Sequence, residues 1–167
     1  MTHVLHVSAS PGGEGSRSLA LAGAFLDAWR QAHPAHTYEA VDVWNLDLPE
    51  FDASMIAAKF AVLRAQNATA AQQAQWDRAV RVSQQFNRAD VYVFSVPMWN
   101  YGLPYRLKHY IDIVTLPGQN WRWSRAEGYQ PLLSGKRAFL MVSSAGDFSD
   151  GATAQYEDFQ RPYLRQW

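Results

Sequence analysis

The chain has 167 residues, 48% of them hydrophobic and 18% charged, which suits one folded domain of ordinary size and argues against disorder. It carries 15 Lys and Arg against 15 Asp and Glu, so its charge gives no reason to expect nucleic acid or an anionic membrane as partner. Cysteine is absent, which excludes disulfides, thiolate nucleophiles and cysteine-ligated metals or clusters in this sequence. The sequence shows neither a membrane-length apolar run nor a signal peptide. We expect a soluble, cytoplasmic protein with a single domain over 1–167.

Strands and helices are predicted to alternate along the chain. A short apolar strand over 3–8 leads through a Ser-, Pro- and Gly-rich loop into a helix over 16–32. The apolar residues of this helix recur at i, i+3, i+4 and i+7 from Ala22, which predicts one buried face. The later predicted elements are a strand over 38–43, an Ala-rich and interrupted helical stretch over 52–70, a helix over 71–88, a strand over 91–96, a helix opened by Pro104, a long loop over 117–135, a strand over 137–143 and a last helix from near Ala152.

This alternation predicts an α/β fold built on a doubly wound parallel sheet. The strand over 91–96 is almost entirely apolar, as expected for a central strand covered by helices on both faces. Four strands can be assigned. The carboxyl ends of such strands meet at one edge of the sheet, which is where open α/β sheets bind ligands.

The loop after the first strand carries Ser10, Ser16, Arg17 and Ser18 around three glycines. Glycines allow the backbone to approach a ligand closely, and a helix N-terminus attracts anions through its free N–H groups. The hydroxyls and Arg17 could complete a phosphate cradle. An ordinary flexible loop with Ser16 as the helix N-cap explains the same residues, and both interpretations stay open here. The loop is neither a Walker A motif nor a dinucleotide fingerprint.

The turn Pro97-Met98-Trp99-Asn100-Tyr101 follows the apolar strand over 91–96. Aromatic rings, a carboxamide and free backbone groups would suit a flat, hydrogen-bonding ring system such as an isoalloxazine. The alternative is a structural turn between prolines whose aromatic residues fill the core. The sequence Ser144-Ala145-Gly146-Asp147 follows the fourth strand and, taken alone, is typical of an ordinary turn. The predicted topology nevertheless brings all three loops to one crevice.

The chain resembles the FMN-dependent NAD(P)H:quinone reductase and azoreductase family, which has a flavodoxin-like fold. The resemblance spans essentially the whole chain, and its most specific part is the block 97–112. It implies a five-stranded sheet of order 2-1-3-4-5, of which the last strand is missing here. Further matching residues are Ser10 with Ser16 to Ser18, Gly118, Trp121-Arg122-Trp123, Gly128, Leu132 to Lys136 and Ser144 to Gly146.

The resemblance implies FMN as cofactor, NADH or NADPH as donor, and quinones and azo compounds as acceptors in a homodimer. The phosphate-binding serines of the family map onto Ser10, Ser16 and Ser18, with Arg17 beside them. The ring-binding residues map onto Pro97, Met98, Trp99, Asn100 and Tyr101, and the turn at the flavin edge onto Ser144, Ala145, Gly146 and Asp147. Trp99 and Tyr101 replace a usual Tyr and Phe, and the last turn is typically Arg-Gly-Gly.

Trp121 and Trp123 stand where the family has smaller aromatic residues, and we expect them to bind the acceptor. The alternative is that these indoles only hold their loop to the body of the protein. We assign no catalytic acid or base and no metal ligand, because hydride transfer is the chemistry of the flavin itself. Two rival functions stay open: a flavodoxin-like electron carrier, which zero net charge disfavours, and a relative without FMN.

Overall fold

The computed structural model describes residues 1–149 and 156–167. This part of the chain divides into two compact units, each described by itself below. Unit 1 comprises Met1–Asn45, Asp90–Lys108 and Arg137–Trp167, and unit 2 comprises Leu46–Ala89 and His109–Lys136. No helix in the described ranges is long and apolar enough to cross a membrane.

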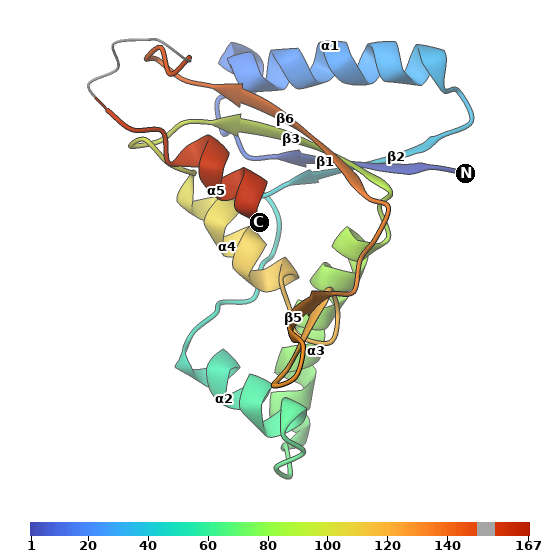
Figure 1. Cartoon of the computed structure of the whole chain (residues 1–167), viewed down its shortest axis with the longest axis vertical. Coiled ribbons are helices and arrows are strands. Elements are labelled where there is room, and N and C mark those ends of the chain that lie inside the picture. Colours follow the sequence, from blue (N-terminus) through green and yellow to red (C-terminus); the bar gives the residue numbers. More distant parts are fainter. Residues whose placement is uncertain (150–155) are drawn as a thin grey trace. The chain divides into compact units, whose positions relative to one another are not determined.

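Unit 1 is built on a parallel sheet of four strands in the order β2-β1-β3-β6 (Figure 1). The pairings align Ser8 of β1 with Asp42 of β2 and with Ser95 of β3, and Pro97 of β3 with Ser143 of β6. The doubly wound parallel sheet predicted from the sequence is confirmed, with its four predicted strands in the expected order. The strands are β1 (His3–Ser8), β2 (Thr37–Asp42), β3 (Val91–Pro97) and β6 (Arg137–Ser143).

Helix α1 (Arg17–Ala32) covers one face of this sheet (Figure 1). Its predicted apolar face is confirmed, because Ala22 and Leu26 are buried in a cluster formed with the strands. The strand residues of that cluster are Val4, Val91, Val93 and Met141. Val91 and Val93 of β3 lie on the same face because side chains alternate between the two faces along a strand. Tyr92 and Phe94 therefore point to the opposite face, where the ring of Trp167 lies 5.8 Å from that of Phe94.

The last helix, α5 (Gln160–Gln166), begins later than the sequence predicted. We expected it from near Ala152; residues 152–155 lie outside the described part of the chain, and residues 156–159 are not helical. Asp158 explains the boundary, because its carboxylate accepts hydrogen bonds from the N–H groups of Gln160 (2.7 Å) and Arg161 (3.1 Å). A carboxylate in this position caps the first turn of a helix.

Unit 2 contains α2 (Ala53–Leu63), α3 (Ala70–Asn87) and most of α4 (Tyr105–Val114), which starts directly after Pro104. The expected break in the stretch 52–70 is real. The predicted long loop over 117–135 is wrong, because it holds an antiparallel hairpin of β4 (Trp121–Ser124) and β5 (Gly128–Pro131). Trp123 pairs with Tyr129 across it, and aromatic pairs of this kind stabilise β-sheets.

Candidate functional site

Three loops leave unit 1 at the same edge of the sheet, after β1, β3 and β6. The loops after β1 and β3 are each hydrogen-bonded to the next strand where they begin. The N–H of Ala9 donates to the carbonyl of Ser95 at 2.9 Å, and the N–H of Met98 donates to the carbonyl of Ser143 at 2.7 Å. In these two loops the first residues after the strand still pair with the neighbouring strand. The structure places the three loops that carry the residues predicted for cofactor binding at one edge of the sheet.

The loop after β1 closes around the start of α1. Ser16 is the N-cap, and its Oγ accepts a hydrogen bond from the N–H of Leu19 at 3.3 Å. The same Oγ shares a hydrogen bond with the Oγ of Ser18 at 3.2 Å. Ser10 lies close by, and its Oγ accepts from the N–H of Gly12 at 3.3 Å. The N-cap interpretation of Ser16 is thus confirmed, and it leaves a cluster of hydroxyls at the N-terminus of a 16-residue helix.

The serines and the arginine of this loop differ in their exposure. Ser10, Ser16 and Ser18 are buried, whereas Arg17 is exposed. A Cβ on Gly12 would stand 3.4 Å from the Oγ of Ser10 and 3.6 Å from the Cβ of Ser16. A Cβ at position 12 would therefore lie in van der Waals contact with the serine cluster. The arrangement offers hydroxyls, helix N–H groups and a cation, which is a set of groups that suits a phosphate.

The turn after β3 is a tight hairpin turn at Trp99–Gly102. Trp99 and Gly102 exchange backbone hydrogen bonds of 3.1 and 2.9 Å, and both intervening residues have positive φ, 47° at Asn100 and 65° at Tyr101. Positive φ at both central residues is typical of a type I′ turn, which usually has Gly at the second of them. Tyr101 holds that position with a side chain that is 41% exposed. The turn thus presents an exposed carboxamide and an exposed ring under backbone strain.

The loop after β6 presents Ser144, Ala145, Gly146 and Asp147, all exposed. The Oγ of Ser144 donates to the carbonyl of Gly146 at 2.8 Å. Asp147 accepts hydrogen bonds from the Oγ and the N–H of Ser149, and these bonds hold the pKa of its carboxyl group below the usual value. Asp147 is therefore an anion near neutral pH, with its carboxylate engaged within its own loop.

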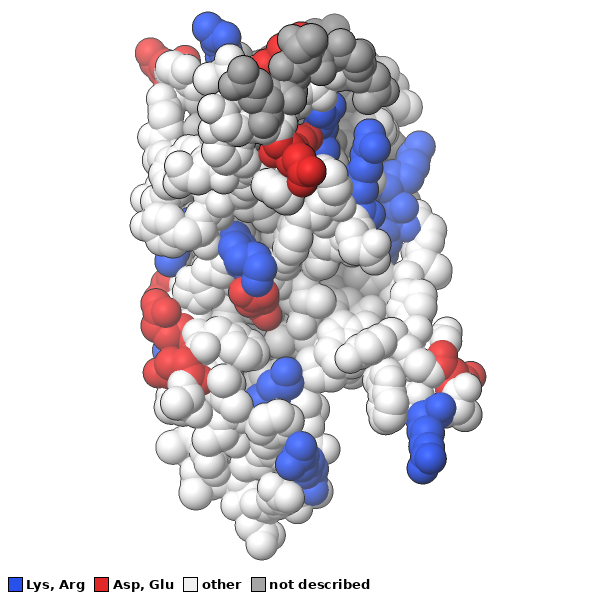
Figure 2. Space-filling model, turned by 60° about the vertical axis from the view of Figure 1, so that its left-hand side comes forward, with Lys and Arg blue, Asp and Glu red and all other residues white. Residues whose placement is uncertain are grey.

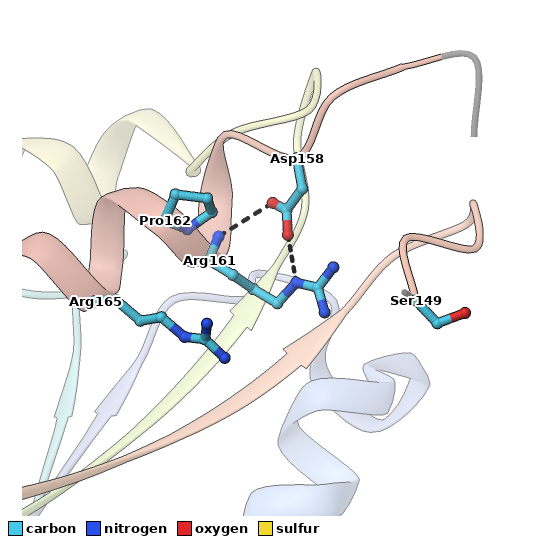
Figure 3. A pocket seen from close by; sticks show the side chains of 5 residues that line it. All are labelled: Ser149, Asp158, Arg161, Pro162 and Arg165. Atoms are coloured by element: carbon cyan, nitrogen blue, oxygen red, sulfur yellow. Dashed lines mark hydrogen bonds and ion pairs between the residues drawn. The ribbon is translucent and has the colours of Figure 1, made fainter. Parts of the chain in front are cut away.

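Arg161 of α5 is hydrogen-bonded to the loop after β6. Its guanidinium pairs with Asp158 and donates to the carbonyl of Phe148. Figure 3 shows Asp158, Arg161 and Arg165 around a pocket of about 410 Å³, with Ser149 on its other side and Pro162 in its lining. Burial alone would raise the pKa of Asp158, but the hydrogen bonds from Arg161 and Gln160 outweigh it and lower that pKa. The loop after β6 and the start of α5 thus share one ion pair.

Sequence reasoning missed three aromatic side chains at this edge. The ring of Trp44, which follows β2, lies 5.4 Å from Trp99, and the ring of Tyr105 lies 5.3 Å from Trp44. Tyr156 was also missed, and its ring stacks on Tyr101 at 5.1 Å. Trp44 could have been found, because the end of β2 lies at the same sheet edge as the ends of β1 and β3.

Trp121 and Trp123 belong to unit 2. Trp121 is half-buried, with its ring 5.3 Å from that of Tyr129, while Trp123 is 59% exposed. Both lie on strand β4 of the hairpin and not in an irregular loop. Their predicted role in acceptor binding stays a prediction. In the described ranges no group of three or more His, Asp and Glu side chains could hold a metal ion.

The fold and these loops can now be compared with known proteins. A family model described as a flavodoxin-like fold matches residues 2–167. The chain belongs to this flavodoxin-like family. FMN-dependent NADH:quinone oxidoreductase 2 of Pseudomonas syringae pv. tomato is 40% identical over 165 residues, which cover 99% of this chain and 78% of the relative. FMN-dependent NADH:quinone oxidoreductase of Desulfotalea psychrophila is 37% identical over 164 residues, or 98% of this chain and 77% of that one.

A solved structure agrees with the sequence relatives. The structure of the azoreductase from Bacillus anthracis str. Sterne matches with a TM-score of 0.87 at 29% identity, covering 99% of this chain and 79% of that one. The resemblance inferred from the sequence is therefore confirmed at the level of the family.

Proposed function

We propose that this flavodoxin-like protein binds FMN at the edge formed by the ends of β1, β3 and β6, and transfers two electrons from NADH to quinones. The observation that carries the proposal is the convergence of three loops at the ligand-binding edge of an open α/β sheet, where the loops after β1 and β3 are each hydrogen-bonded to the next strand. The relatives named FMN-dependent NADH:quinone oxidoreductases support it. NADPH as a second donor and azo compounds as further acceptors extend the same proposal.

The residues of the first loop fit the phosphate of FMN. Free N–H groups in the first turn of α1 and the hydroxyls of Ser10, Ser16 and Ser18 would donate to it, with Arg17 adding charge. Hydrogen bonds within the loop hold these hydroxyls, since Ser16 and Ser18 share one and Ser10 accepts another from Gly12. Preorganised donors lose little entropy on binding. The phosphate distinguishes FMN from riboflavin, so this loop would set the preference between them.

The residues of the other two loops fit the flavin ring. Met98, Trp99 and Tyr101 would supply apolar and aromatic contact, and Asn100 would hydrogen-bond to the polar edge of the ring. The exposed backbone of Ala145 and Gly146 would face the same edge. Asp147 replaces an expected glycine, and its carboxylate accepts from Ser149 rather than being free to accept from a ligand.

Bound FMN would supply the two-electron chemistry, so the chain needs no acid or base of its own. The residues of the site bind and orient the ring, leave one face open for donor and acceptor in turn, and exclude water from it. Use of one face by both substrates predicts ping-pong kinetics. Charged side chains of both signs are interspersed on the face shown in Figure 2, as expected for an enzyme of small substrates rather than a carrier that docks by charge.

The proposal includes a homodimer and the two tryptophans of the hairpin. The hairpin exposes Trp123 (59%) and Tyr129 (74%), and α2 exposes Ile56, Phe60 and Leu63. Exposed apolar side chains at this density are typical of partner surfaces. Trp121 and Trp123 would hold the planar acceptor. Light scattering at micromolar concentration tests the dimer, and a fully active monomer would contradict it.

The decisive experiment combines spectroscopy and turnover on the purified protein. A denatured sample should release a yellow chromophore with the mass of FMN, and the protein should oxidise NADH only when a quinone is present. Flavin binding without turnover would favour the electron carrier. A colourless protein that takes up no FMN in titration would overturn the proposal and leave the family fold without its flavin.

A further inference from the structure

Trp44 connects the two loops to which the proposed function assigns the phosphate and the ring of FMN. It lies after β2, and its backbone N–H donates to the carboxylate of Asp42 at 3.0 Å. The Nδ2 of Asn45 donates to the other oxygen of the same carboxylate at 2.6 Å. Asp42 thus holds the turn in which Trp44 stands, a common way for aspartate to fix a turn. The backbone that carries the indole is therefore held in place.

The indole N–H of Trp44 is directed to the loop after β1. It donates to the carbonyl of Ala9 at 3.0 Å, and the N–H of Ala9 itself donates to Ser95 at 2.9 Å. Ala9 is fully buried and directly precedes Ser10. A residue bonded on both sides in this way has little freedom, so the hydrogen bond from Trp44 sets where the serine-containing loop begins.

The face of the same indole contacts the turn after β3. Its ring centre lies 5.4 Å from that of Trp99 with the planes at 48°, and 5.3 Å from that of Tyr105 at 85°. These distances are typical of stabilising aromatic pairs. Arg106, next to Tyr105, also donates from its Nε to the carbonyl of Val43 at 2.9 Å. The start of α4 and the ring of Trp99 are therefore both held against the end of β2.

We propose that Trp44 is a positioning residue that fixes the phosphate loop and the ring turn relative to each other, and so sets the preference of this site for FMN over riboflavin. This inference rests on the proposed function. Trp44 does not itself touch the flavin in this proposal. It acts through Ala9 on one side and through Trp99 on the other, so its two contacts can be removed separately.

The chain offers a matched control in Trp29. Like Trp44 it is half-buried in unit 1, and its indole N–H also donates to one acceptor, the Nδ1 of His36 at 3.1 Å. Its ring packs against Phe25 and Phe139 at 5.5 Å. Trp29→Phe and Trp44→Phe therefore remove the same chemical group and keep an aromatic ring. Only Trp44 contacts the two loops.

The experiment measures FMN and riboflavin affinity for the wild type, Trp44→Phe and Trp29→Phe, with the melting temperature of each. Trp44→Phe should weaken FMN binding about two- to tenfold, the effect of one hydrogen bond, and change riboflavin binding less. Trp29→Phe should leave both affinities unchanged at a similar loss of melting temperature. Hydrogen exchange of the flavin-free protein should speed up around Ala9 to Ser16 in Trp44→Phe alone.

Three results would overturn the inference. Unchanged affinities in Trp44→Phe, an equal loss for both flavins, or an equal loss in both variants would each contradict a positioning role. In all three cases the wild type binds FMN, so the proposed function stands. A wild type that binds no FMN would instead remove the proposed function, and the inference with it. If Trp44→Phe does not fold, the exchange of residues 9–16 in Asp42→Ala decides, since that change frees the backbone of Trp44.

Discussion

The hydroxyls of Ser16 and Ser18 share a hydrogen bond of 3.2 Å at the N-terminus of α1, and both side chains are buried. Ser16 has a second role as the N-cap, because its Oγ accepts a hydrogen bond from the N–H of Leu19. Within residues 1–149 and 156–167, the Oγ of Ser18 makes no hydrogen bond to the backbone. Single substitutions of the two serines therefore distinguish a loss of helix capping from a loss of ligand binding. A double substitution would remove both at once.

We predict that Ser18→Ala lowers FMN affinity at least tenfold while the free energy of unfolding changes little. The reason is that one charge-assisted hydrogen bond to a phosphate is worth about 1.5–3 kcal/mol. Ser16→Ala should lower FMN affinity as well and also destabilise the protein by about 1 kcal/mol, because a helix cap is lost. Flavin titration and chemical denaturation measure the two effects. Riboflavin is the control ligand, and an equal loss of riboflavin affinity would show that the loop acts only through folding.

Backbone strain at Tyr101 can be measured with two matched variants. Both Tyr101→Gly and Tyr101→Ala remove the ring that stacks on Tyr156. Only glycine adopts a φ of 65° without strain, so Tyr101→Gly should be more stable than Tyr101→Ala by about 1 kcal/mol. In a helix or strand the order of stability is the reverse, because glycine there is less stable than alanine. Urea denaturation of both variants measures the difference, and a more stable Ala variant would mean that the turn is not left-handed at this position.

Stability should fall at acidic pH because of His6. Its ring nitrogen bonds to the Oγ of Ser95 at 3.0 Å, and burial, with a smaller contribution from Arg30, lowers its pKa below the ordinary 6.5. The unfolded chain therefore takes up the proton first, so the free energy of unfolding should decrease as the pH falls below about 6.5. His36, also with a lowered pKa, contributes in the same direction. Denaturation between pH 8 and pH 5 should show a shallower loss in His6→Gln, and a parallel loss in both proteins would assign the effect to other groups.

Trp123→Ala tests the acceptor site with little structural risk, since this indole is 59% exposed. We expect KM for quinone to rise or kcat/KM to fall about tenfold, because one aromatic contact is worth roughly 0.5–1.5 kcal/mol beyond its buried area. FMN content and melting temperature should stay normal. Trp121→Ala, which also loses the contact with Tyr129, should be less stable. Loss of stability in both variants without an effect on quinone kinetics would favour the role of holding the hairpin in place.

The sequence predicted the sheet well because its central strands are apolar on both faces and its helices have one clear apolar stripe. It also predicted which loops meet, since parallel strands bring their carboxyl ends together. It failed where a structure depends on contacts distant in sequence. The place of Trp44 after β2 could have been predicted from the topology, but the hydrogen bond from its indole N–H to Ala9 could not. The hairpin was missed because its Gly and Pro residues suggested a loop. Its two strands depend on cross-strand pairs such as Trp123 with Tyr129.

The single guanidinium of Arg161 has a thermodynamic consequence. Because it joins the carbonyl of Phe148 to the carboxylate of Asp158, the order of the loop after β6 and the order of the first turn of α5 are linked. Linkage is reciprocal: if order in one segment stabilises order in the other, the second stabilises the first by the same coupling free energy. A ligand bound at Ser144 to Asp147 should therefore slow trypsin cleavage at Arg165, so the C-terminal helix would report on occupancy of a loop to which it contributes no ligand-binding side chain.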